Sequence, residues 1–216
     1  MIYLSSTTDI DEKYKWNEFG IMISANKSIG GWKNAMSSNV KWMMDNNAFS
    51  QSFSMKNWIN GLIKYSPYIE NCLGIPIPDS VGNSLETIRL FSKYYSIVHE
   101  LGFMVAFVSQ DGITPEITPW DSFDTLFIGG TDDHKLSDEA IVMIAEGKLR
   151  NKHVHVGRVN SQSRIKQFWM ADSVDGTQLT IGGTSTSKQH EFADAVTWCR
   201  NRKNSMNANG QFRMQI

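Results

Sequence analysis

The sequence has only two cysteines among its 216 residues, and they lie far apart. Cys72 and Cys199 belong to no CxxC pair, which argues against a disulfide framework and against a cysteine-rich zinc site. We therefore expect two buried free thiols and no metal site built on cysteine.

Long apolar runs are also missing. No uninterrupted run approaches the roughly 20 residues that span a bilayer, so no membrane segment is predicted. The amino-terminal residues lack a basic segment followed by an apolar one, so they do not resemble a secretory signal. We expect a cytoplasmic protein.

The net charge is only −1, but charge is unevenly distributed. Residues 148–216 hold 11 Lys and Arg against 4 Asp and Glu, whereas residues 1–147 hold 10 against 18. This asymmetry is typical both of a part that binds an anionic partner such as a phosphate backbone and of solvated helix faces. The basic residues form two groups: Lys148, Arg150, Lys152, Arg158, Arg164 and Lys166, then Arg200, Arg202, Lys203 and Arg213.

Short apolar runs alternate with segments of helical periodicity, which predicts repeated βα units and a parallel sheet. Because the chain is shorter than the roughly 250 residues of a full eight-fold barrel, we expect an α/β fold of the trimmed TIM-type (β/α) barrel, as a single domain over residues 1–216. Residues 1–19 and about 204–216 are expected to be loosely ordered. The predicted strands are 21–24, 40–44, 72–77, 104–109, 125–129, 153–157 and 178–182. The predicted helices begin at Met55 with Ser54 as N-cap, at Ser84 and at Ser137, and cover 160–170 and 188–202.

Polar residues follow several of these apolar runs. Asp45 ends VKWMMD, Asp79 ends IPIPD, Gln110 ends MVAFVSQ, Gly129-Gly130 end TLFIGG, and Asp175 lies in ADSVDGT. Each one alone is typical of a turn or a helix cap. In a parallel barrel, however, the carboxyl ends of the strands converge on one pocket, where the active site lies.

Taken in order, the motifs MMDNNAFS, IPIPD, VSQDG, FIGG and HVHVGRVNSQSRIKQFWMADSVDGT resemble the tRNA-guanine transglycosylase family. Within it, the chain is most similar to the short phage DNA-guanine transglycosylases of 7-deazaguanine DNA modification. The resemblance covers about residues 20–185. In HVHVGRVNSQSRIKQFWMADSVDGT, a strand ending at Gly157 is followed by a helix and an aspartate-x-x-aspartate turn, Asp172 to Asp175.

The resemblance implies base exchange on a nucleic acid. Asp175 would be the nucleophile that attacks the sugar C1′, and Asp45 the general acid and base. Asp79, Gln110 and the Gly129-Gly130 backbone would bind the purine, with Phe49 or Trp120 as a stacking partner. Arg158, Arg164 and Lys166 would hold the flanking phosphates.

The chain lacks the cluster of three cysteines and a histidine that binds zinc in the tRNA enzymes, so no zinc and no other cofactor is expected. DNA is then the expected polymer. The expected co-substrate is a free 7-deazaguanine base such as 7-cyano-7-deazaguanine. If the protein is viral, the implied location is the cytoplasm of the host. The family also implies a homodimer. His153 and His155 face one side of their strand, where they would contact a phosphate or a metal. The alternatives are an RNA (tRNA-like) guanine transglycosylase, a non-catalytic nucleic-acid-binding barrel and a base-excising glycosylase.

Overall fold

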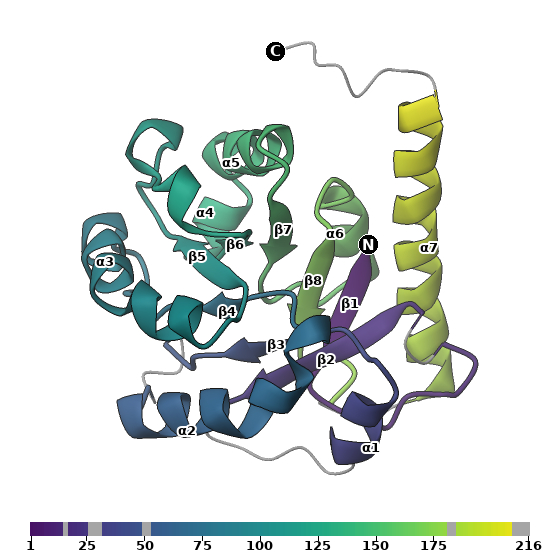
Figure 1. Cartoon of the computed structure of the whole chain (residues 1–216). Coiled ribbons are helices and arrows are strands. Elements are labelled where there is room, and N and C mark those ends of the chain that lie inside the picture. Colours follow the sequence, from purple (N-terminus) through teal and green to yellow (C-terminus); the bar gives the residue numbers. More distant parts are fainter. Residues whose placement is uncertain (15–16, 26–31, 49–52, 181–184, 209–216) are drawn as a thin grey trace.

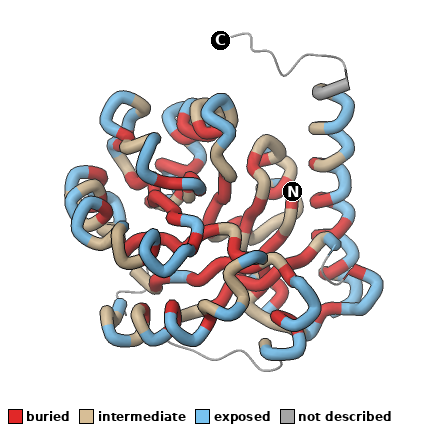
Figure 2. The backbone as a smooth tube through the Cα atoms, in the orientation of Figure 1, coloured by how far each residue is buried: buried red, intermediate tan, exposed pale blue. Residues whose placement is uncertain are grey.

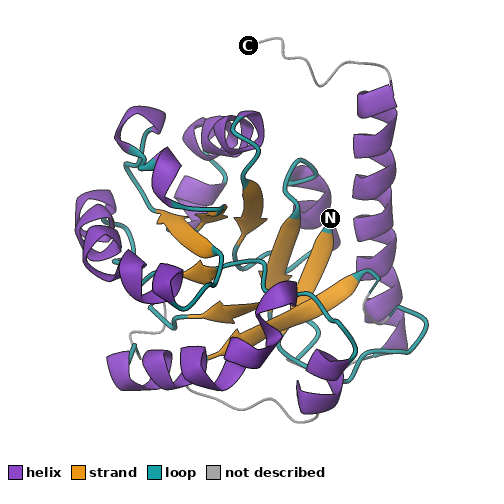
Figure 3. Cartoon of the chain, in the orientation of Figure 1, coloured by secondary structure: helices purple, strands orange, loops and turns teal. Residues whose placement is uncertain are grey.

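Eight parallel strands form a nearly closed barrel that helices surround, as Figures 1 and 3 show. The structure is a computed structural model that describes residues 1–14, 17–25, 32–48, 53–180 and 185–208. The strand order is β3-β2-β1-β8-β7-β6-β5-β4, and a bridge between Trp42 and Cys72 links the two ends of the sheet. The predicted TIM-type (β/α) barrel is therefore confirmed.

The strands are short. They are β1 (Ile2–Ser5), β2 (Phe19–Ser24), β3 (Trp42–Asp45), β4 (Ile75–Pro76), β5 (Val105–Ser109), β6 (Thr125–Ile128), β7 (His153–Val156) and β8 (Ser173–Gly176).

The α-helices are α1 (Trp32–Ser37), α2 (Met55–Tyr65), α3 (Ser84–Glu100), α4 (Asp132–Lys135), α5 (Asp138–Leu149), α6 (Gln162–Gln167) and α7 (Thr186–Ala208). Three 3-10 helices lie at η1 (Ser66–Asn71), η2 (Pro115–Ile117) and η3 (Trp120–Ser122). The predicted caps Ser54 and Ser137 accept hydrogen bonds from Asn57 N and Ala140 N, because their hydroxyls satisfy backbone donors that the first turn leaves unpaired. At α3 the cap is Asn83, and Ser84 is the first helical residue.

Two of the sequence-based predictions are wrong. Residues 2–5, expected to be loosely ordered, form β1, and β1 pairs with β2 on one side and β8 on the other. The last strand is β8 at 173–176, where the sequence predicted a turn, whereas the described part of the predicted strand 178–182 is a turn. β1 and β8 are each only four residues long, which is too short for a clear pattern. β8 is also polar at Ser173 and Asp175, so it lacks an apolar run. Residues 204–208 belong to α7, and 209–216 lie outside the described residues.

The barrel has two apolar clusters. The larger fills the space between strands and helices, and Figure 2 shows the strands buried beneath helices that expose their outer faces. The smaller contains Leu4, Met22, Met43 and Ala106, with Phe127 partly buried against it. Met22 and Met43 are paired in register on β2 and β3, so they face the same side of the sheet. Both cysteines are buried and free, as predicted. None of the helices in the described ranges is long and apolar enough to cross a membrane.

Asp172 links β1, β7, α5 and α7 at the amino-terminal end of the barrel. Its carboxylate accepts hydrogen bonds from Lys148 Nζ of α5 at 2.6 Å, Lys203 Nζ of α7 at 3.1 Å and Val154 N of β7 at 2.9 Å. Its carbonyl accepts from Ile2 N of β1. Burial alone would raise the pKa of Asp172, but the two ammonium groups outweigh it and lower this pKa to about 2.

We predict that Asp172→Asn lowers the free energy of unfolding by about 2 kcal/mol at pH 7. The pKa of Asp172 is lower in the folded than in the unfolded state. Its stabilising contribution is therefore fully present above the unfolded value near 4 and is lost as the pH falls toward 2. Urea unfolding at several pH values from 7 down to 3 measures this, with the exposed Asp133→Asn as control. An equal loss at pH 7 and pH 3 would contradict the ion-pair account.

Candidate active site

A cavity of about 240 Å³ lies at the carboxyl ends of the strands. Strand-end residues from β3 to β8 line it, the position where (β/α) barrels hold their active sites. The predicted site residues that line it are Asp45, Asp79, Gln110, Gly129, Gly130, Arg158 and Asp175. The other lining residues are Met22, Asn46, Ala48, Pro76, Val81, Val108, Phe127, Lys135, Gly157 and Thr177.

Asp175 is held by a chain of hydrogen bonds that runs down the inside of β7 and β8. Its Oδ1 lies 3.0 Å from His155 Nε2 and accepts from Arg158 N at 3.2 Å. His155 Nδ1 lies 2.8 Å from Ser173 Oγ, which in turn lies 2.8 Å from His153 Nε2. The backbone of Arg158 has φ +59°, a left-handed conformation that turns its N–H toward the carboxylate. His155 thus contacts Asp175 directly, and Ser173 links His155 to His153.

The direction of this chain follows from its ends. A carboxylate only accepts, so in the Asp175 contact His155 Nε2 is the donor, and in a neutral imidazole the other nitrogen, Nδ1, then accepts from the Ser173 hydroxyl. Ser173 Oγ then accepts from His153 Nε2. Burial lowers the pKa of His153 to about 4, so at pH 7 this ring is neutral and, in this arrangement, carries its proton on Nε2.

Asp79 lies between two side-chain amides. Asn46 Nδ2 donates to its Oδ1 at 2.7 Å, and Gln110 Nε2 donates to its Oδ2 at 2.6 Å. Both amides have fixed orientations, because Gln110 Oε1 accepts from Gly82 N and Asn46 Oδ1 accepts from Ala48 N. Burial raises the pKa of Asp79 to about 6, and the charge of Asp45 adds to this against the two amide donors.

Asp45 ends β3, and its carboxylate is open to solvent at the cavity. Asn47 N donates to its Oδ1 at 2.9 Å, in a tight turn where Asn47 has φ +62°. The surrounding protein removes enough water to raise the pKa of Asp45, the negative charge of Asp175 raises it further, and the Asn47 N–H opposes both. Asp45 thus binds a proton more readily than an isolated aspartate.

The two glycines after β6 bring backbone to the cavity wall. A Cβ on Gly129 would lie 2.8 Å from Val108 Cγ1 and 3.1 Å from Gln110 Nε2. At Gly130, φ is +80° and a Cβ would lie 2.6 Å from Asp111 Oδ2. Asp111 fixes this turn by accepting hydrogen bonds from Thr131 N and Thr131 Oγ1. Because Gly129 N donates to Ser109 O, a contact with a flat ligand would come from Gly130 N.

Sequence reasoning missed three residues that line the cavity, Asn46, Phe127 and Lys135. It also missed the contact of His155 with Asp175. Lys135 is only 3% exposed, and its Nζ donates to Gly157 O at 3.2 Å. Phe127 packs on His155 with ring centroids 4.5 Å apart. The even spacing of His153 and His155 was the available signal for an inward-facing pair, whereas nothing in the periodicity marks Lys135.

Other predicted residues lie outside the cavity. Arg164 Nη1 is 3.6 Å from Asp132 Oδ2, and Lys166 Nζ lies over the Trp198 ring. Trp120 donates to Pro115 O and packs on Phe123, and it does not line the cavity. Phe49 lies outside the described residues. Among the residues whose positions are described, no group of three or more His, Cys, Asp or Glu is arranged to hold a metal ion.

The fold and the cavity define a (β/α) barrel with a pocket at the carboxyl ends of its strands, and three carboxylates and two cationic residues line this pocket. No protein-family model matches the chain, and no curated protein matches it.

We predict that the carboxyl group of Asp79 titrates near pH 6, and that Gln110→Ala raises this pKa because it removes a donor that favours the charged form. Carboxyl ¹³C NMR between pH 4 and 8 measures the titration. Gln162→Ala, a change of the same kind on α6, is the control. A pKa that is unchanged in Gln110→Ala would show that the amide does not stabilise the carboxylate.

Proposed function

We propose that the protein is a base-exchange transglycosylase that replaces guanine in DNA with a 7-deazaguanine through a covalent aspartyl-sugar intermediate. The observation that carries the proposal is the convergence of Asp45, Asp79, Gln110, the diglycine and Asp175 on one cavity. These are the residues that the resemblance to guanine transglycosylases selects. They come from strands far apart in the sequence, and the barrel brings the carboxyl ends of these strands together.

The Asp79 side of the pocket matches the edge of a guanine. The ring N–H and the exocyclic amino group of guanine are donors, which the Asp79 carboxylate would accept. Each carboxylate oxygen keeps acceptor capacity beyond its amide contact. Gly130 N would donate to the carbonyl oxygen of the base, and Phe127 offers the aromatic surface in the cavity.

The chemistry proceeds in two displacements at the same carbon. An oxygen of Asp175 bonds to C1′ while the bond from C1′ to the purine nitrogen breaks, and the bonding pair leaves with the purine. Asp45 gives its proton to the departing guanine. The incoming 7-deazaguanine then loses the proton on its attacking nitrogen to Asp45, bonds to C1′ and releases Asp175. Two inversions retain the configuration at the sugar.

The hydrogen-bond donors around each carboxylate support this division of roles. Asp175 accepts from His155 and Arg158 N, which hold its carboxylate in one orientation at the cavity, whereas the raised pKa of Asp45 favours a bound proton. A target guanine in duplex DNA must leave the helix to reach the pocket, which costs a few kcal/mol in lost stacking and pairing.

The direct test incubates the protein with guanine-containing DNA and 7-cyano-7-deazaguanine, digests the DNA and analyses the nucleosides by mass spectrometry. We expect the deazaguanine deoxynucleoside with the wild type, none with Asp175→Ala, and a rate lower by about 10²- to 10⁴-fold with Asp45→Ala. Asp133→Asn is the control for a surface carboxylate.

Each other outcome selects another function. Modification of RNA but not DNA would reassign the polymer, and abasic sites in the product would indicate a glycosylase. Binding of DNA without any reaction by the folded protein would indicate a non-catalytic nucleic-acid-binding barrel.

A second prediction concerns His155 as a positioning residue for Asp175. We expect His155→Leu to lower kcat by roughly 10- to 100-fold with little change in KM for the base, because it removes a donor to a charged group.

His155→Gln, which retains an N–H donor, should recover part of the rate. His153→Gln, two hydrogen bonds further from Asp175 along the same chain, is the control. A His155→Leu enzyme with an unchanged kcat would rule out the positioning role.

A further inference from the structure

Three cations surround one carboxylate at the edge of the cavity. Arg158 Nη2 lies 3.0 Å and Lys135 Nζ 3.1 Å from Asp132 Oδ1, and Arg164 Nη1 lies 3.6 Å from Asp132 Oδ2. We call these four residues the Asp132 cluster. The hydrogen bond and charge of Lys135, together with the charges of both arginines, lower the pKa of Asp132. With Asp132 ionised, the cluster carries a net charge of about +2.

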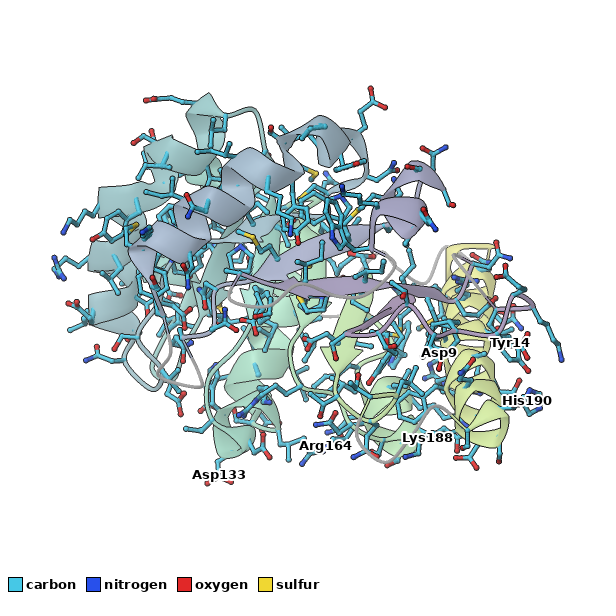
Figure 4. All side chains as sticks on the ribbon, turned by 90° about the horizontal axis from the view of Figure 1, so that it is seen from below. Asp9, Tyr14, Asp133, Arg164, Lys188 and His190 are labelled. Atoms are coloured by element: carbon cyan, nitrogen blue, oxygen red, sulfur yellow. The ribbon has the colours of Figure 1, made fainter. Side chains whose placement is uncertain are left out.

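The cluster is assembled from three separate elements beside the proposed nucleophile. Asp132 and Lys135 lie on α4 after β6, Arg158 follows β7, and Arg164 lies on α6. Lys135 and Arg158 line the cavity, and the backbone N–H of Arg158 contacts Asp175. In Figure 4 the side chain of Arg164 lies at an edge of the molecule that also carries Asp133 and Lys188. The cluster therefore joins the cavity to the surface.

Burial differs across the cluster in a way that favours a ligand. The Asp132 side chain is 55% exposed and those of the two arginines about a third, whereas that of Lys135 is only 4% exposed. A buried ammonium needs an anion to offset its desolvation, and burial does lower the pKa of Lys135. The anion that now meets this need is the most exposed member of the cluster, and it is open to replacement from solvent.

A phosphodiester has the charge and the geometry to take that position. Like a carboxylate it bears one negative charge and two exposed oxygens, and arginine binds both groups through its planar fork of donors. The pocket neighbours the cluster, so a nucleotide whose base enters the pocket would bring its own phosphate, or that of the next nucleotide, to this edge.

We propose that the Asp132 cluster is the binding subsite for one backbone phosphate of the nucleic-acid substrate, and that Asp132 competes with this phosphate for Lys135, Arg158 and Arg164. This inference rests on the proposed function in taking a nucleic-acid strand as the ligand. Asp132 keeps the three cations in place in the free protein and lowers the affinity for the polymer.

The first test measures the affinity for a fluorescent single-stranded oligodeoxynucleotide by anisotropy, in an Asp175→Asn background that prevents covalent capture. Asp132→Asn should bind about fivefold more tightly at low salt, because it removes the competing charge and keeps the side-chain shape. Asp133→Asn is the matched control, since it makes the same charge change at the next residue of α4. An equal gain in both variants would reduce the effect to net charge and overturn the proposal.

The second test counts phosphate contacts from the salt dependence of binding. Arg164→Gln should reduce the slope of log K against log salt by about 0.7 for single-stranded DNA, the loss of one phosphate contact, and Lys135→Gln should do the same. Arg89→Gln, which removes an exposed arginine on α3, is the control. Because Lys135 is buried, the fold of its variant is checked by circular dichroism, and Arg164→Gln decides the question if that variant unfolds.

The results separate the subsite from the proposed reaction, because base exchange is assayed independently. Exchange by the wild type with an unchanged slope in Arg164→Gln would overturn the subsite and leave the reaction standing. A reduced slope in a protein that exchanges no base would support the subsite and overturn the reaction. If the parent protein binds neither DNA nor RNA, the subsite is overturned as well.

Discussion

The pairing of β1 with β2 on one side and β8 on the other is the constraint on which the site depends. In this register Leu4 lies beside both Gly20 and Asp175, so the first strand of the chain joins the two parts of the barrel. Asp45 belongs to the part formed by β2 and β3, and Asp175, Gln110 and the diglycine to the part from β4 to β8. The bridge between Trp42 and Cys72 links the same two parts on the other side of the barrel, so β1 and this bridge together fix the relative position of Asp45 and Asp175. Asp172 and Arg200 strengthen this junction at the amino-terminal end, where Ile2 N contacts Asp172 O and Arg200 Nε donates to Met1 O.

Much of the cavity wall was predictable because it depends on local sequence. An apolar run that ends in a polar residue indicates the end of a strand. In a parallel barrel the carboxyl ends of all strands meet, so the fold class alone predicts that Asp45, Asp79 and Gln110 lie close together. Asp175 was found from its motif even though its strand was not. The inward positions of β8 are Ser173 and Asp175, and these functional side chains replace the apolar residues that reveal a buried strand.

The rest depends on which elements meet, and periodicity does not encode that. Asn46 looks like a turn residue, and its role appears only because Asp79 from the next strand comes within 2.7 Å of it. Lys135 lies on a four-residue helix, which is too short to show a periodic pattern. Its ammonium group donates to Gly157 O, directly after the end of β7. The sequence did not predict β1 for a related reason. Its four residues form a strand because they pair with a strand on each side, and one of these strands, β8, is distant in the sequence.

The polar groups of the cavity are fixed before any ligand arrives. The side-chain carbonyl oxygens of Gln110 and Asn46 each accept a hydrogen bond from a backbone N–H. This fixes both amides with their amino groups pointing at Asp79. Asp111 fixes the diglycine turn in the same way through Thr131. Such groups need little reorganisation when a charge develops near them, which is the condition under which hydrogen bonds contribute most to catalysis. The arrangement also explains why both glycines are needed, because a side chain at either would displace one of these fixed groups.

The three carboxylates of the cavity differ in the donors that hold them and in their contact with solvent. Within the described residues Asp175 accepts from an imidazole and a backbone N–H, Asp79 accepts from two amides, and Asp45 accepts from the Asn47 N–H. Donors favour the charged form, and each negative charge makes ionisation of its neighbours harder. Asp45 has the fewest donors and the most solvent contact, so it combines a raised pKa with access to protons. Burial raises the pKa of Asp79 to about 6 even though two amides donate to it, so the number of donors alone does not decide which carboxyl group is protonated, and it is contact with solvent that distinguishes Asp45.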